Sequence, residues 1–160
     1  CGGQAWAADS SALFTGSATL GMFGSGLWRI DSATGNVFTL LPTEAGGGIY
    51  NLAKDPYLAP DGQLYFFFAT APSPDGFINR GPLQMVRSAP DGVTGRTVLR
   101  PDSFLLMNES LWAPDASFVI AAMAPADTVF AGGQLNLYYI DPSQPPLFLL
   151  PFGQQLKWGP

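Results

Sequence analysis

The chain contains no histidine, one cysteine, and only two glutamates and two lysines in 160 residues. Without histidine it cannot build a serine–histidine–aspartate triad, and a lone cysteine adds too little for a zinc site or an iron–sulfur cluster. No apolar run approaches the roughly 18 residues that a membrane-spanning helix needs. The sequence therefore predicts no metal, no cofactor, no catalytic residues and no spanning segment.

The few charges that remain are informative by their kind. The formal net charge is −5, so there is no basic stripe to contact phosphates, which argues against a nucleic-acid partner and against docking on an anionic membrane. Ten of the twelve acidic residues are Asp, which favours turns where Glu favours helices. With 19 Gly and 15 Pro, this composition predicts a turn-rich, all-β fold.

A short motif recurs about every 50 residues: a bulky residue, then Ala-Pro-Asp-Gly or a variant, then an apolar run. The copies are Trp6-Ala7-Ala8-Asp9, Leu58-Ala59-Pro60-Asp61-Gly62, Trp112-Ala113-Pro114-Asp115-Ala116 and Trp158-Gly159-Pro160. Pro presets φ for a turn, Asp accepts hydrogen bonds from backbone amides, and Gly takes a positive φ. The Trp supplies apolar area to wedge between neighbouring sheets. We expect these motif residues to be structural.

The repeat predicts the architecture. Each unit holds four short strands, as in one propeller blade, and the apolar run Leu64 to Ala69 suits a strand buried on both faces. We predict an all-β propeller fragment: about three four-stranded antiparallel blades in an open arc, forming one partial domain over 1–160. The units span approximately 6–57, 58–111 and 112–157. A β-sandwich is the alternative.

The same motif copies, with the second-strand sequences Leu27 to Asp31 and Leu137 to Asp141, resemble the TolB-like propeller repeat. The resemblance covers essentially the whole chain. It implies one of two settings. The first is an extracytoplasmic protein (periplasmic, secreted or in the cell envelope) whose propeller binds protein partners. The second is a prolyl-oligopeptidase-type serine peptidase, whose catalytic domain would lie outside this chain.

Completeness is a separate question. Three units do not close a propeller, because closed propellers usually have about four to eight blades. We therefore expect the chain to pack against further blades of a larger protein. Cys1 is then either a boundary where a longer chain was cut or a lipidated cysteine followed by Gly2 and Gly3.

Three long loops are the candidate binding surface, because they join the same pair of strands in each unit and should emerge on one rim. They cover 16–26, 71–82 and 125–133. The residues expected to bind are Met22, Phe23, Phe77, Arg80 and Phe130. Aromatic side chains beside an Arg suit a protein or peptide partner, and the alternative is that the Phe side chains fold back onto the blades. The expected function is a non-catalytic, protein- or ligand-binding scaffold.

Overall fold

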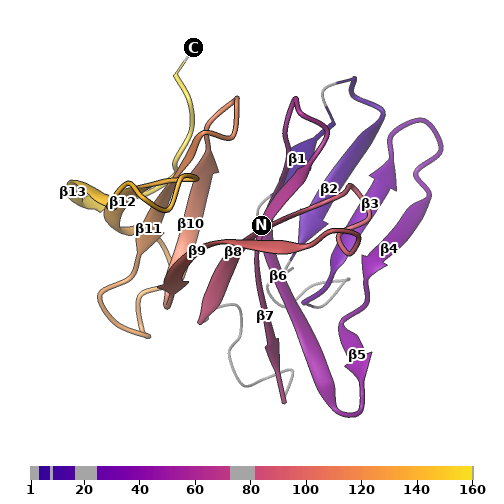
Figure 1. The fold of residues 1–160 in the computed structure, drawn as a ribbon, viewed down its shortest axis with the longest axis horizontal. Coiled ribbons are helices and arrows are strands. Elements are labelled where there is room, and N and C mark those ends of the chain that lie inside the picture. The colour runs from indigo at the N-terminus through magenta and orange to yellow at the C-terminus, as the bar shows by residue number, and fades with distance from the viewer. Residues whose placement is uncertain (1–3, 8, 17–24, 73–81, 160) are drawn as a thin grey trace.

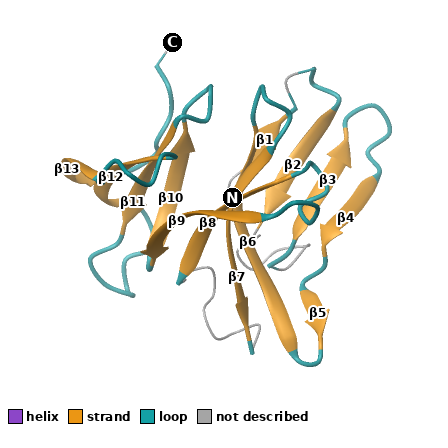
Figure 2. Ribbon diagram, in the orientation of Figure 1, coloured by secondary structure: helices purple, strands orange, loops and turns teal. Residues whose placement is uncertain are grey.

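Thirteen strands, and no helix, make up the described part of the chain in the computed structural model, which covers residues 4–7, 9–16, 25–72 and 82–159 (Figure 2). The first sheet contains β1 (Gln4–Trp6), β2 (Ala12–Gly16), β3 (Leu27–Asp31) and β4 (Val37–Leu41). The second contains β5 (Glu44–Gly46), β6 (Ile49–Leu58), β7 (Leu64–Ala71), β8 (Leu83–Ser88) and β9 (Thr97–Phe104). The third contains β10 (Met107–Trp112), β11 (Phe118–Met123), β12 (Gly133–Tyr139) and β13 (Leu147–Gly153). Within the described residues, no helix could cross a membrane.

Each sheet is an antiparallel meander, and the three stand side by side in an open fan (Figure 1). The long strand β6 packs against β1 and β2 of the first sheet and against β10 of the third. The prediction of an all-β, open arc of three antiparallel blades is therefore confirmed. The second sheet has a fifth strand, β5, which forms a tight hairpin with β6 through Gly47 and Gly48, both at positive φ (61° and 75°).

The sheets do not coincide with the predicted units 6–57, 58–111 and 112–157. The strand that leads into each motif turn, predicted to close the preceding unit, instead pairs with the strand that follows the turn: β6 with β7, and β10 with β11. The motif turn is too short to let the chain leave the sheet, so it forms a hairpin and its two flanking strands must pair. Each sheet therefore begins one strand earlier than the sequence units.

The second sheet is buried on both faces, as its apolar β7 predicts. Leu64 and Phe66 face the first sheet in a cluster with Phe14 and Leu27. Tyr65 and Phe67 belong to the opposite cluster, and the buried members that the third sheet adds to it are Met107, Trp112, Val119 and Ala121. The alternation of side chains along β7 thus supplies the apolar core of both interfaces between sheets.

The motif turns share one hydrogen-bond pattern. Oδ1 of Asp9, Asp61 and Asp115 accepts the backbone N–H two residues later, at 2.9, 2.9 and 3.0 Å. The residue after each Asp has a positive φ: 59° at Ser10, 77° at Gly62 and 57° at Ala116. Pro60 and Pro114 precede these carboxylates in exposed positions. The acidic side chains of the motif therefore hold the turns.

The bulky residues of the last three motif copies pack backwards, onto the sheet whose strands come before them in the chain. Leu58 lies against the core of the first sheet, and Trp112, 6% exposed, lies against Tyr65 and Phe67 of the second. Trp158 meets Phe118 of the third sheet edge-on, with ring centroids 6.0 Å apart. Trp6 is 58% exposed. Among the described residues, no sheet precedes the one to which Trp6 belongs.

Candidate functional site

The predicted rim surface can be placed only in part. Met22, Phe23, Phe77 and Arg80 lie outside the described residues. Phe130, in the loop between β11 and β12, is 74% exposed. Binding by the rim loops therefore stays a prediction. The described residues form a different candidate site, a pocket between the three sheets.

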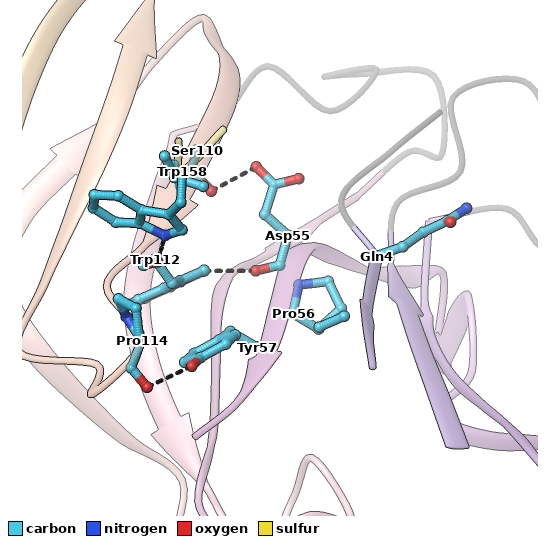
Figure 3. A pocket seen from close by; sticks show the side chains of 10 residues that line it. Gln4, Asp55, Pro56, Tyr57, Ser110, Trp112, Pro114 and Trp158 are labelled. Atoms are coloured by element: carbon cyan, nitrogen blue, oxygen red, sulfur yellow. Dashed lines mark hydrogen bonds between the residues drawn. The ribbon is translucent and has the colours of Figure 1, made fainter. Parts of the chain in front are cut away.

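We call the strands that lead into the motif turns, β1, β6 and β10, the inner strands. A pocket of about 250 Å³ lies where these three strands meet (Figure 3). It is lined by Gln4, Ala5, Asp55, Pro56, Tyr57, Ser110, Leu111, Trp112, Pro114 and Trp158. All three sheets contribute to this lining, so the pocket exists only in the assembled arc. We call it the inner-strand pocket.

A bulge in β6 places Asp55 in the inner-strand pocket. The register with β7 shifts between Lys54 and Tyr57, where Pro56 lacks the N–H that a regular ladder needs. Asp55 has a φ of 50°, a conformation that is uncommon for non-glycine residues but that Asp adopts more readily than most. The bulge interrupts the regular pairing of β6 with β7 and turns the Asp55 side chain toward the third sheet.

The contacts of Asp55 connect the second sheet to the third. Its carboxylate Oδ2 accepts a hydrogen bond from Ser110 Oγ at 2.9 Å, and its backbone carbonyl accepts one from Trp112 Nε1 at 2.8 Å (Figure 3). The residue is only 5% exposed. A buried carboxylate that accepts hydrogen bonds is a strong determinant of local geometry, because losing a partner would leave a costly polar group behind.

Lys54 reaches the same neighbouring strand by a different route. Its Nζ donates to the carbonyl oxygens of Met107 at 2.8 Å and Asn108 at 3.0 Å, and the residue is 7% exposed. Successive side chains in a strand point to opposite faces, and the bulge at Asp55 brings both charged groups onto β10. The two residues together fix the spacing of β6 and β10, and hence the shape of the pocket.

The remaining wall is aromatic. Tyr57 and Trp112 are stacked, with centroids 6.5 Å apart and an interplanar angle of 10°, and the Tyr57 hydroxyl donates to the Pro114 carbonyl at 2.6 Å. Burial, helped by the charges of Asp115 and Asp61, raises the pKa of Tyr57, which further favours the protonated hydroxyl that donates this hydrogen bond. Trp158 Nε1 donates to the Trp112 carbonyl at 2.9 Å.

These interactions show what the inner-strand pocket can do. The Ser110 hydroxyl is bonded to the Asp55 carboxylate, and the aromatic side chains of the wall donate to backbone carbonyls, which hold them in place. Such a site suits the binding of an apolar or aromatic group. In the described ranges, no group of three His, Cys, Asp or Glu side chains is arranged to hold a metal ion.

The sequence analysis did not single out these residues, although a signal was present. Lys54, Asp55 and Pro56 interrupt an otherwise apolar strand, and a Pro within a strand marks a bulge or an edge. Charged residues in a strand with both faces covered are unusual unless they are paired. Their partners on β10 could not be identified without knowing that β6 and β10 are neighbours.

Comparisons with known proteins bear on the fold. No family model matches the chain, and no curated protein sequence matches it either. Among solved structures, the chain is similar to TolB from Acinetobacter baumannii, with a TM-score of 0.54 and 20% sequence identity. The match covers 94% of this chain and 32% of the TolB chain, so the chain spans about a third of that protein's length. This similarity shows a TolB-like β-propeller fold.

Proposed function

We propose that this chain is a non-catalytic segment of a β-propeller that binds a protein or peptide, and that the inner-strand pocket is part of its binding surface. The observation that carries the proposal is a hydrogen-bonded set in which buried Lys54, Asp55 and Trp112 join half-buried Ser110 to hold a rigid pocket where three sheets meet. A preformed, mostly apolar pocket loses little freedom on binding.

The test is selection of peptides from a display library against the purified 160-residue chain, followed by affinity measurements on one pocket variant. Gln4 is exposed and lines the pocket, so Gln4→Trp should block the entrance without removing an internal contact. Gln134→Trp is the matched control, because Gln134 is also an exposed strand residue but does not line the pocket. We expect selected peptides to lose about ten-fold or more in affinity for the Gln4 variant alone. Equal binding to both variants would contradict the proposal.

The rim loops are the second part of the proposed surface. Met22, Phe23, Phe77, Arg80 and Phe130 combine aromatic side chains with an arginine, the residue types that dominate protein interfaces. Phe130 supports this assignment because its aromatic ring is 74% exposed and so accessible to a partner. If the rim takes part, Phe130→Ala should weaken the same selected peptides while leaving the melting temperature unchanged.

The proposal includes further blades and a place outside the cytoplasm. The face of the third sheet that points away from the second carries Phe118 and Ile120, and their cross-strand partners Tyr139 and Leu137 share that face. Leu147, paired with Leu137, is 50% exposed. Such a surface suits another blade of the same polypeptide. We expect the isolated 160-residue chain to self-associate in sedimentation, and a sharp monomer over a wide concentration range would count against further blades. The location rests on the TolB-like repeat and is tested by fractionating cells that make the protein.

A further inference from the structure

The two interfaces between sheets are built from equivalent positions but are not equally filled. Leu58 and Trp112 each end an inner strand and pair across the motif turn with a residue at the start of the next strand, Leu64 and Val119 respectively. Trp112 fills its interface and is 6% exposed. Leu58 occupies the equivalent position between the first and second sheets with a much smaller side chain.

A second position shows the same reduction. Tyr65 lies under Trp112 and is the cross-strand partner of Arg87, while Phe14 is the cross-strand partner of Arg29 in the first sheet. The Tyr65 hydroxyl donates to Asp61 Oδ2 at 2.9 Å. Phe14 has no hydroxyl to offer Asp9, which is the motif aspartate of its own turn. The first interface therefore lacks both an indole ring and a hydroxyl donor that the second one contains.

A pocket of about 390 Å³ lies at this point. It is lined by Ala7, Asp9, Ser11, Ala12, Phe14, Arg29, Leu58 and Pro90. None of these residues lines the inner-strand pocket, so the two pockets are distinct. Phe14, Ala7 and Ala12 are buried and give it an apolar floor, whereas Asp9 and Arg29 add one charge of each sign. We call it the inter-sheet pocket.

The geometry points to the inter-sheet pocket as a binding site for an aromatic group of indole size, presented by a neutral ligand such as a peptide side chain. An apolar cavity of about 150 Å³ is enough to take up benzene, so the volume is adequate for two fused rings. The charges are complementary to an indole. The Asp9 carboxylate suits its N–H donor, and the Arg29 guanidinium suits the electron-rich face of its ring. The ligand would supply the ring that Trp112 supplies in the other interface.

The probe is N-acetyl-L-tryptophanamide, titrated into the 160-residue chain with methyl groups observed by NMR. We expect saturable shifts at the Leu58, Ala7 and Ala12 methyl groups, because an indole ring placed over them changes their local magnetic field. N-acetyl-L-leucinamide is the control ligand and should bind more weakly by about ten-fold. If the tryptophan amide gives no saturable shift at these methyl groups up to its solubility limit, the site does not exist.

Variants that fill the pocket separate this site from binding elsewhere. Leu58→Trp should occupy the space with the protein's own ring and weaken the probe by about ten-fold or more. Gln134→Trp, which adds the same ring at an exposed position on β12 outside both pockets, should leave binding unchanged. If Leu58→Trp melts early, Pro90→Trp fills the pocket from an exposed turn and should have the same effect. Undiminished binding to a folded filling variant would overturn the inference, whereas Gln4→Trp should have no effect on this probe.

Discussion

Replacing Trp112 by Leu tests whether the motif tryptophan is the wedge that joins neighbouring sheets. The variant gives the interface between the second and third sheets a Leu, the residue type that Leu58 provides between the first and second sheets. It removes the hydrogen bond from Trp112 Nε1 to the Asp55 carbonyl and the ring contacts to Tyr57, Tyr65 and Phe67. The change therefore affects both the core of the interface and the wall of the inner-strand pocket.

The expected magnitude follows from these contacts. A buried carbonyl left without its donor costs about 1–3 kcal/mol, and each aromatic pair contributes about 0.5–1.5 kcal/mol beyond the area it buries. Leu recovers part of the apolar contact, so we expect the free energy of unfolding to fall by about 2–4 kcal/mol, somewhat less than the roughly 3–5 kcal/mol for truncating a buried aromatic side chain to Ala. That is a large share of the roughly 5–15 kcal/mol by which domains are stable.

The assay is urea unfolding at 25 °C followed by far-UV circular dichroism, with the midpoint and the slope both fitted. Trp6→Leu is the matched control, since Trp6 ends the inner strand of the first sheet in the same way but is 58% exposed. We expect that control to cost about 0.5 kcal/mol or less. Equal losses in the two variants would refute the reasoning that Trp112 stabilises the fold through its burial between sheets and not through its place in the motif.

Three further outcomes are expected. Arg100 is 3% exposed; its Nε donates to Asp102 at 2.8 Å, and its Nη1 donates to three carbonyls of the third sheet and its turn. Arg100→Met should therefore lower the free energy of unfolding in urea by about 2–4 kcal/mol, and Arg100→Lys should lose less, because Lys keeps the charge but not the planar set of donors. Ser10 is exposed with a φ of 59°, so Ser10→Gly should raise stability by about 0.5–1 kcal/mol, and a loss instead would show that the turn is not strained. Hydrogen bonds from the Thr94 hydroxyl and from two backbone amides lower the pKa of Asp91. The stability that this carboxylate contributes is therefore fully present above its unfolded pKa of about 3.9, and it is lost as the pH falls through the lower native pKa. The melting temperature should therefore decline less steeply below about pH 4 for Asp91→Asn than for the unaltered chain.

The sequence predicts the strands well because their signals are local. The Pro-Asp turns, the apolar run of β7 and the hairpin turns each depend on a few neighbouring residues, and the structure has strands on both sides of them. The grouping of the strands into sheets is harder to predict from the sequence. The spacing of the motif defines a repeat but not where the repeat begins, and only the hairpin geometry of the motif turn shows that β6 pairs with β7 and β10 with β11.

The inner-strand pocket could not be predicted from the sequence for a different reason. Asp55 and Ser110 are 55 positions apart, and no local pattern relates them. Their contact depends on a bulge in β6 and on the distance between two inner strands, which are properties of the assembled arc. A residue such as Asp55 could be recognised as unusual in a strand, but its partner could not be named.

The backward packing of the motif side chains also has a consequence for synthesis on the ribosome. Leu58, Trp112 and Trp158 each complete the apolar surface of a sheet whose strands come earlier in the chain. A newly made blade therefore stays uncovered until the first strand of the next one has left the exit tunnel. Folding of this chain should lag behind translation by about one repeat, and at each moment the last finished sheet is the one most open to chaperones and proteases.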